Sequence, residues 1–183
     1  MNTANKLTIF RVILVPIFMV LMLIDSFACQ MAALAVFALA SFTDFLDGQI
    51  ARKHNQITTF GKFMDPLADK VLTTAAFIIF LQQGVIDSWA IMLILTREFM
   101  VAGVRLCAVG EEGNVIAASF WGKFKTVSQM VAIIASILIL NMSFVPEATG
   151  IIISAVLIWI SVIFTVISGI EYLVQNWHLM KLK

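Results

Sequence analysis

Residues 43–52 read TDFLDGQIAR, and they follow a largely apolar run that begins near Met31. The run is long enough to lie inside a lipid bilayer, yet it ends in two carboxylates and an arginine. An ionised acid costs about 2.5 to 3.5 kcal/mol at the bilayer centre on insertion scales, and less near the interface. Charged groups in such a place need a partner, and they usually mark a functional site.

The composition of the whole chain is that of an integral membrane protein. Of its 183 residues, 61% are hydrophobic and 13% are charged, and the mean hydropathy is +1.01. Ordinary soluble domains contain about 25% charged residues. The net charge of +1 gives no reason to expect a nucleic-acid partner. Because no polar linker divides the chain, we expect residues 1–183 to form a single transmembrane domain.

Six stretches have the length and apolarity of membrane-spanning helices. They cover residues 8–24, 31–52, 65–82, 88–106, 125–140 and 151–174. Residues 1–7 precede the first stretch and are expected to form a short interfacial segment. The sequence therefore predicts an all-α integral membrane protein built as a bundle of six transmembrane helices.

Lysine and arginine are distributed unevenly over the connections between these stretches. They occur near both termini and around the second and fourth connections, whereas the other three connections contain Asp25, Asp87 and Glu147 and no basic residue. By the positive-inside rule, both termini and the second and fourth connections face the cytoplasm. We expect a multi-pass protein of the inner (cytoplasmic) membrane.

Four carboxylates lie around the second connection. Asp44 and Asp47 precede it and Asp65 and Asp69 follow it, with spacings of three and four residues that put each pair on one face of its helix. The adjoining ends of two spans can bring the four acids together, and their mutual repulsion then requires a cation. Oxygen ligands without cysteine or a histidine pair favour Mg²⁺ or Mn²⁺. Four carboxylates suit two such ions.

Paired divalent ions are a recurrent device for displacement at phosphorus. Small residues next to the acids, Gly48, Ala51 and Gly61, would let a substrate approach the helix backbone closely. The same acids are also compatible with a small ion or proton transporter, because intramembrane carboxylates mark ion pathways as well.

Single residues of the group have structural interpretations too. Asp47 and Arg52 have the charges of an interfacial ion pair, and Asp65, which stands directly before Pro66, has the position of a helix cap. Asp44 is an acceptor for a hydrogen bond from a neighbouring helix. Four acids at helical spacing on adjoining spans favour the functional interpretation.

The motif around the acids resembles the signature of the CDP-alcohol phosphatidyltransferases. It reads Asp44-x-x-Asp47-Gly48-x-x-Ala51-Arg52, then eight residues, then Gly61-x-x-x-Asp65-x-x-x-Asp69. All eight fixed positions agree with the signature. The resemblance implies a six-helix membrane bundle, usually a homodimer, whose active site opens toward the cytoplasm.

The resemblance also implies a role for each position of the motif. The metal ligands would be Asp44, Asp47, Asp65 and Asp69. Asp69 would in addition be the general base that takes the proton of the attacking alcohol. The nucleotide pocket would contain Gly48, Ala51, Arg52 and Gly61, with the guanidinium facing phosphate oxygens. The reaction would be attack of an alcohol on the lipid-linked phosphorus of a CDP-activated lipid, with release of CMP.

Features outside the motif bear on the acceptor alcohol. The opening Asn5-x-x-Thr8-x-x-Arg11 is similar to that of the phosphatidylglycerophosphate synthases and the related cardiolipin synthases. It adds Asn5 and Thr8 to the expected nucleotide pocket and leaves Arg11 as a further candidate. Residues 96–98 (TRE) and 122–126 (GKFKT) resemble the enzymes that use glycerol 3-phosphate in particular.

The expected substrates are therefore CDP-diacylglycerol and sn-glycerol 3-phosphate, in a reaction of phospholipid biosynthesis. A phosphorylated acceptor needs cationic groups around its phosphate. The expected groups are Arg97, Arg105, Lys123 and Lys125, with Glu98 as a further candidate. The alternatives are phosphatidylglycerol as acceptor, as in a cardiolipin synthase, and inositol phosphate.

Arg97 lies about nine residues into its span, where an arginine needs a partner or a polar cavity. Adjacent helical residues point about 100° apart, so Glu98 is poorly placed as its direct partner. We expect Arg97 to face the active-site cavity, and the alternative is a structural salt bridge to an acid such as Glu171. Arg105, Lys123 and Lys125 also have an explanation as positive-inside residues.

Overall fold

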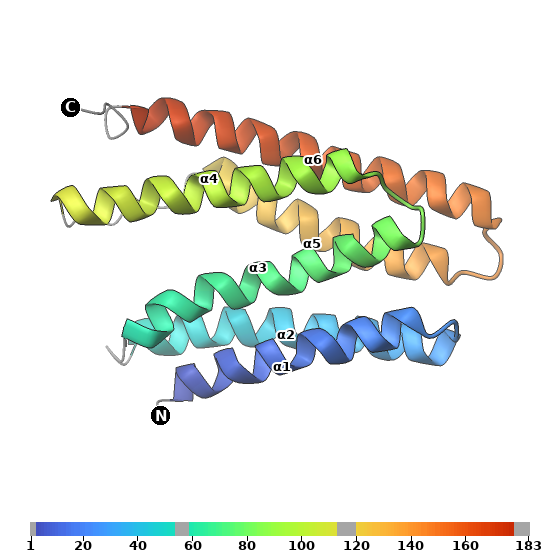
Figure 1. The fold of residues 1–183 in the computed structure, drawn as a ribbon. Coiled ribbons are helices and arrows are strands. Elements are labelled where there is room, and N and C mark those ends of the chain that lie inside the picture. The colour runs from blue at the N-terminus through green and yellow to red at the C-terminus, as the bar shows by residue number, and fades with distance from the viewer. Residues whose placement is uncertain (1–2, 54–58, 113–119, 178–183) are drawn as a thin grey trace.

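The computed structural model describes residues 3–53, 59–112 and 120–177, and within them the side chains of residues 7–43, 70–104 and 120–177. The described part is helical throughout apart from short connections (Figure 1). Its helices are α1 (Thr3–Leu23), α2 (Phe27–Lys53), α3 (Thr59–Gln82), α4 (Ser88–Glu112), α5 (Phe120–Leu140) and α6 (Glu147–Gln175).

Each predicted span corresponds to one of these helices, so the predicted all-α architecture is confirmed. Several helices are longer than their apolar stretches: α3 begins at Thr59, α4 continues to Glu112 and α5 begins at Phe120. α1 begins at Thr3, so the segment expected before the first span is continuous with that helix. No glycine or proline lies between Thr3 and Leu7 to interrupt the helical hydrogen bonds.

The helices alternate in direction along the bundle. The first turn of α1 and the last turns of α2, α4 and α6 lie on the same side of the molecule (Figure 1). We call this side the motif end, because the acidic motif lies there. The connections that contain Asp25, Asp87 and Glu147 lie at the opposite end. This arrangement agrees with the distribution of lysine and arginine in the sequence.

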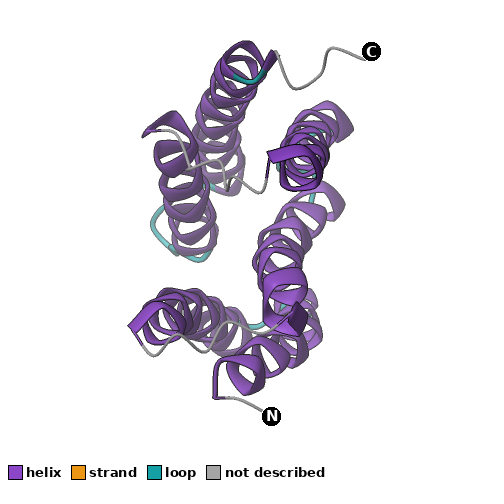
Figure 2. Cartoon of the chain, turned by 90° about the vertical axis from the view of Figure 1, so that its left-hand side faces the viewer, coloured by secondary structure: helices purple, strands orange, loops and turns teal. Residues whose placement is uncertain are grey.

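The bundle consists of two halves that meet along a narrower seam. In the first half α1 packs against α2 and α3, and in the second half α6 packs against α4 and α5. The halves touch where α5 meets α2 and α3 and where α3 meets α4. Figure 2, in which the motif end faces the viewer, shows the first half below and the second half above.

The outer faces of the helices are apolar and several inner contacts are polar. On α6, Ser154, Ser161, Thr165 and Ser168 are buried, whereas the exposed positions between Ile152 and Val174 are all isoleucines and valines. Small polar residues at helix contacts and apolar residues facing outward are typical of helices in lipid. On length and hydropathy α5 and α6 are each able to cross a bilayer, and α1, α2 and α3 carry shorter apolar stretches within the described side chains.

A layer of aromatic and aliphatic side chains fills the interior of the first half and the seam. Phe18 of α1 and Phe37 of α2 are completely buried, with ring centroids 5.7 Å apart. Phe77 and Phe80 of α3 and Ile133 of α5 belong to the same cluster. Each large apolar side chain of this kind buried from water contributes about 1.5 to 3 kcal/mol. In lipid, close packing rather than transfer from water is the main gain.

Candidate functional site

The acidic motif lies on the two helix ends that face each other across the second connection. Asp44 and Asp47 lie in the last turns of α2, and Asp65 and Asp69 lie in the first turns of α3. The backbone is helical at all four positions, so the spacings of three and four residues put each pair on one helix face. α2 and α3 are in contact. The side chains of these acids lie outside the described part, so their ligand roles stay predictions.

Most of the expected nucleotide pocket shares this region of the backbone. Gly48, Ala51 and Arg52 belong to α2, Gly61 to α3 and Asn5 to α1. Their side chains, like that of Arg105 on α4, lie outside the described side chains. Their roles also stay predictions.

Two residues from the opening of the chain are described, and both are completely buried. Thr8 and Arg11 lie one helical turn apart on α1, and each has 0% exposure. Because α1 packs on α2 and α3, the two side chains face the helices that carry the acids. Full burial of a guanidinium is unusual unless its charge is compensated. In this respect Arg11 differs from the exposed arginines that serve only the positive-inside rule at the end of a span.

A cluster of charged side chains lies where α3, α4 and α5 meet. At its centre is Glu98 of α4, which is 6% exposed. Lys70 Nζ of α3 lies 2.5 Å from Glu98 Oε2, Lys125 Nζ of α5 donates a hydrogen bond to Glu98 Oε1, and Arg97 Nη1 donates to the same oxygen at 3.3 Å. We call these four residues the Glu98 cluster.

The Glu98 cluster contains three cations and one carboxylate. Its formal charge is therefore +2, and Lys125 is as buried as Glu98. Concentrated positive charge with little access to water attracts an anion, and charge-assisted bonds to phosphate oxygens are among the strongest that side chains make. Lys70 directly follows Asp69 in the sequence, so the cluster lies beside the acidic motif.

The contact between Arg97 and Glu98 corrects an expectation. Neighbouring positions on a helix point apart, but the arginine side chain is long enough to fold back so that Nη1 lies 3.3 Å from Glu98 Oε1. The alternative partner considered for Arg97, Glu171, lies on α6, where its carboxylate accepts a hydrogen bond from Gln175 Nε2 at 3.2 Å.

The structure separates the two lysines expected at the acceptor site. Lys125 is buried in the Glu98 cluster, whereas Lys123 is exposed, because two residues along a helix turn a side chain to the other face. In the sequence, Lys70 is one of the basic residues around the second connection, and these predict only the topology. Its position next to Asp69 was the available signal, and its contact with Glu98 depends on how α3 packs against α4.

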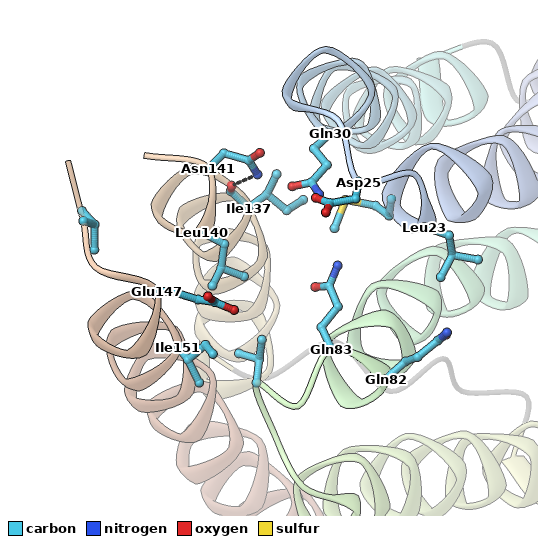
Figure 3. Close-up of a pocket in the computed structure, with 13 residues that line it drawn as sticks. Leu23, Asp25, Gln30, Gln82, Gln83, Ile137, Leu140, Asn141, Glu147 and Ile151 are labelled. Atoms are coloured by element: carbon cyan, nitrogen blue, oxygen red, sulfur yellow. Dashed lines mark hydrogen bonds between the residues drawn. The ribbon is translucent and has the colours of Figure 1, made fainter. Parts of the chain in front are cut away.

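A cavity of about 630 Å³ lies at the opposite end of the bundle. Asp25, Gln30, Gln83 and Glu147 line it, together with Asn141, whose Nδ2 donates to the carbonyl of Ile137 at 2.7 Å (Figure 3). It is far along the helices from the acidic motif and the Glu98 cluster. Among the described side chains, no group of three or more acids, histidines and cysteines is placed to hold a metal ion.

Comparison with known proteins places the chain in a family. Residues 1–167 match the sequence profile of the CDP-alcohol phosphatidyltransferases. The chain belongs to this family, whose members are membrane-bound, and the resemblance recognised in the acidic motif is confirmed.

Individual relatives are similar over almost the whole chain. A CDP-diacylglycerol–glycerol-3-phosphate 3-phosphatidyltransferase of Bacillus subtilis is 42% identical, with 98% of this chain and 97% of the relative covered. An enzyme of the same name from Rickettsia typhi is 38% identical over 93% and 94% of the two chains. A probable phosphatidylglycerophosphate synthase of Mycobacterium tuberculosis is 36% identical over 95% and 81%.

Proposed function

We propose that this chain transfers the phosphatidyl group of CDP-diacylglycerol to sn-glycerol 3-phosphate, giving phosphatidylglycerophosphate and CMP. Its family performs phosphatidyl transfer, and its relatives at 42% and 38% identity carry the name of this reaction. The structural observation that supports a phosphorylated acceptor is the excess positive charge of the Glu98 cluster at the motif end.

The acidic motif has the composition of a site for two divalent ions. Asp44, Asp47, Asp65 and Asp69 supply only oxygen ligands, from facing helix ends, which suits Mg²⁺ or Mn²⁺. Bound there, such ions supply positive charge to the phosphate oxygens on which negative charge develops. The donor set therefore fits the ions that the family resemblance implies.

The remaining steps belong to side chains of the motif. Arg52 holds phosphate oxygens of the nucleotide, next to the small residues Gly48, Ala51 and Gly61, and Asn5 and Thr8 complete the pocket. Asp69 accepts the proton of a glycerol hydroxyl as its oxygen bonds to the lipid-linked phosphorus. The bond from that phosphorus to CMP breaks, and CMP leaves with the electron pair.

The phosphate of the acceptor binds in the Glu98 cluster. Lys70, Lys125 and Arg97 provide the charge, and Glu98 holds the three cations near one another. Lys70 directly follows Asp69 on α3, which supports a short distance between the bound phosphate and the base. Arg105 and Lys123 add positive charge that attracts the acceptor from solution.

The alternative acceptors differ in the charge that they bring. Phosphatidylglycerol, the acceptor of a cardiolipin synthase, carries a phosphodiester with a single negative charge, whereas glycerol 3-phosphate carries a dianionic phosphate near neutral pH. A cluster with a charge of +2 favours the dianion. Inositol phosphate has the same phosphate chemistry, so an acceptor comparison must include it.

We further propose that the motif end faces the cytoplasm, with both termini on that side of the inner membrane, and that the protein is a homodimer. α2 and α4 end, and α3 and α5 begin, at the same end of the bundle (Figure 1). The basic residues of the sequence lie mostly near these helix ends and the chain termini, which supports the orientation. The dimer follows from the family resemblance.

The function is tested by CMP release from purified protein in mixed micelles that contain CDP-diacylglycerol. Glycerol 3-phosphate, phosphatidylglycerol, inositol phosphate and serine are offered separately, with Mg²⁺, with Mn²⁺ and with chelator. We expect release with glycerol 3-phosphate alone, abolished by chelator. Release with another acceptor would keep the class of reaction and reject the acceptor. Ion flux across sealed vesicles, without CMP release, would favour the transporter.

Asp69→Asn separates the base from the rest of the site. The amide cannot accept the proton of the acceptor, so we expect CMP release to fall by about 10²-fold or more. Elution of the variant as a folded protein in gel filtration is the control. Wild-type turnover in the folded variant would remove the base role from Asp69.

A further inference from the structure

The side chain of Arg97 crosses α6 at a glycine. Gly169 is buried in the contact between α4 and α6. A Cβ atom placed on Gly169 would lie 2.9 Å from Cγ of Arg97 and 3.7 Å from its Cβ. Methyl and methylene carbons pack at about 3.5 to 4.0 Å. The arginine stem therefore occupies the space that any other residue at position 169 would fill.

The contact is made by the first carbon atoms of the arginine side chain rather than by its guanidinium group. Cγ lies directly after Cβ, and the guanidinium lies several bonds farther out. A shift of Cγ by rotation about the first side-chain bond would move the guanidinium by a larger distance. Nη1 of Arg97 now lies 3.3 Å from Glu98 Oε1, at the outer limit of a hydrogen bond, so such a movement would take it out of the Glu98 cluster.

We propose that Gly169 is a positioning residue for the acceptor-phosphate site. Its lack of a side chain lets the stem of Arg97 lie against α6 and places the guanidinium in the Glu98 cluster. This inference rests on the proposed function, because the cluster is the site that binds the phosphate. Gly169 does not touch the acceptor itself.

Two other helical glycines provide matched controls. Gly150 is also buried and also on α6, but the nearest atoms to a Cβ there belong to Ile139, Leu140 and Val145, each at an ordinary 3.7 Å. Gly103 is exposed on α4, and a Cβ atom there would meet nothing within 4 Å. Replacing any of the three by alanine changes helix propensity in the same direction, by about 1 kcal/mol.

The test compares Gly169→Ala, Gly150→Ala and Gly103→Ala in the CMP-release assay, with glycerol 3-phosphate and CDP-diacylglycerol varied separately. We expect Gly169→Ala to raise the KM for glycerol 3-phosphate by about tenfold or more, the effect of one lost charge-assisted bond. The KM for CDP-diacylglycerol should stay within about twofold, and both control variants should resemble the wild type in all constants.

A double variant shows whether the effect acts through Arg97. Arg97→Ala removes Cγ and leaves Cβ, which a Cβ atom at position 169 meets at an ordinary 3.7 Å. Gly169→Ala should therefore add no further rise in KM to Arg97→Ala, although both single variants raise it. If Gly169→Ala alone fails to fold, recovery of folded protein in the double variant supports the same contact.

Several results would overturn the proposal. These are an unchanged KM for glycerol 3-phosphate in Gly169→Ala, equal effects on both substrates, additive effects in the double variant, or failure of both Gly169→Ala and the double variant to fold. The wild type separates this inference from the proposed function. A wild type that releases no CMP with glycerol 3-phosphate rejects both, whereas an active wild type with an unaffected Gly169→Ala rejects the positioning role alone.

Discussion

At the scale of single residues, burial distinguishes basic side chains that look alike in the sequence. Lys123 and Lys125 are two residues apart at the beginning of α5, and both fit the positive-inside rule. Only Lys125 enters the interior, where Glu98 accepts its hydrogen bond. A lysine that served topology alone would have no reason to leave the surface, since its buried charge must be compensated.

Lys123 and Lys125 allow a direct comparison of an exposed and a buried cation at the proposed acceptor site. We expect Lys125→Ala to raise the KM for glycerol 3-phosphate by about tenfold or more, because a buried cation that contacts phosphate is lost. Lys123→Ala should raise it by about twofold to threefold, as expected for an exposed charge that acts through solvent. Substrate titrations of CMP release at low and moderate salt measure both, and equal effects of the two variants would contradict the assignment.

Glu98 also contributes to the stability of the fold. Glu98→Gln leaves Lys70, Arg97 and Lys125 close together without their shared counter-charge. Removing one partner of a buried ionic group lowers the free energy of unfolding by about 3 to 5 kcal/mol. Because Lys70 is partly exposed, we expect a loss in the lower part of that range. Unfolding in detergent micelles, followed by tryptophan fluorescence, measures the loss.

The control is Glu147→Gln at the opposite end, where the carboxylate is exposed. Its free energy of unfolding should stay within about 0.5 kcal/mol of the wild-type value. Equal stability of Glu98→Gln and the wild type would show that the three cations do not depend on Glu98.

At the scale of helices, α5 and α6 are held together by polar contacts as well as by packing. Gln129 Nε2 donates to Thr165 Oγ1 at 3.0 Å, and Thr165 Oγ1 donates to the carbonyl of Ser161 at 2.7 Å. All three side chains are buried. The helix contact therefore has a fixed register, which keeps Lys125, one turn before Gln129, at its place in the Glu98 cluster.

Thr165→Val tests the strength of this contact. Valine keeps the shape of threonine but leaves the Gln129 amide without its acceptor, so we expect a loss of about 1 kcal/mol in the free energy of unfolding, within the range of hydrogen bonds between membrane helices. Thr149→Val, at an exposed position of the same helix, is the matched control. A loss of the same size in both variants would assign the effect to helix propensity instead.

Most of the helical architecture was predictable from the sequence, and the site was predictable in part. Apolar runs locate all six helices because a bilayer fixes their length. The extra turns of α3 and α5 were not predicted, since each contains a glycine and a lysine, Gly61 with Lys62 and Gly122 with Lys123, that interrupt the apolar run. The acidic motif has a fixed spacing within two helices, whereas the contacts of Lys70 and Gly169 depend on how helices cross. No spacing in one helix encodes such a crossing.

At the scale of the whole molecule, the orientation in the membrane is open to direct measurement. Lys123 is exposed in the first turn of α5, and Ser143 is exposed in the connection that follows the opposite end of that helix. In a background where both native cysteines are replaced, we expect Ser143→Cys to react with a membrane-impermeant maleimide added to intact spheroplasts. Lys123→Cys should react only after permeabilisation. The reverse pattern of labelling would invert the proposed topology.

In the proposed reaction, the seam between the two halves also separates the groups that act on the two substrates. The helices with the acidic motif, α2 and α3, belong to the first half. The helices α4 and α5, which contribute Arg97, Glu98 and Lys125, belong to the second half. The residues expected to bind the activated lipid thus lie mostly in the first half, and those proposed to bind the acceptor phosphate lie mostly in the second half. Under the proposed function, substitutions in α4 and α5 are therefore expected to change the use of the acceptor while the acidic motif on α2 and α3 keeps its role, and Lys70 of α3, which contacts Glu98 of α4, links the two sites.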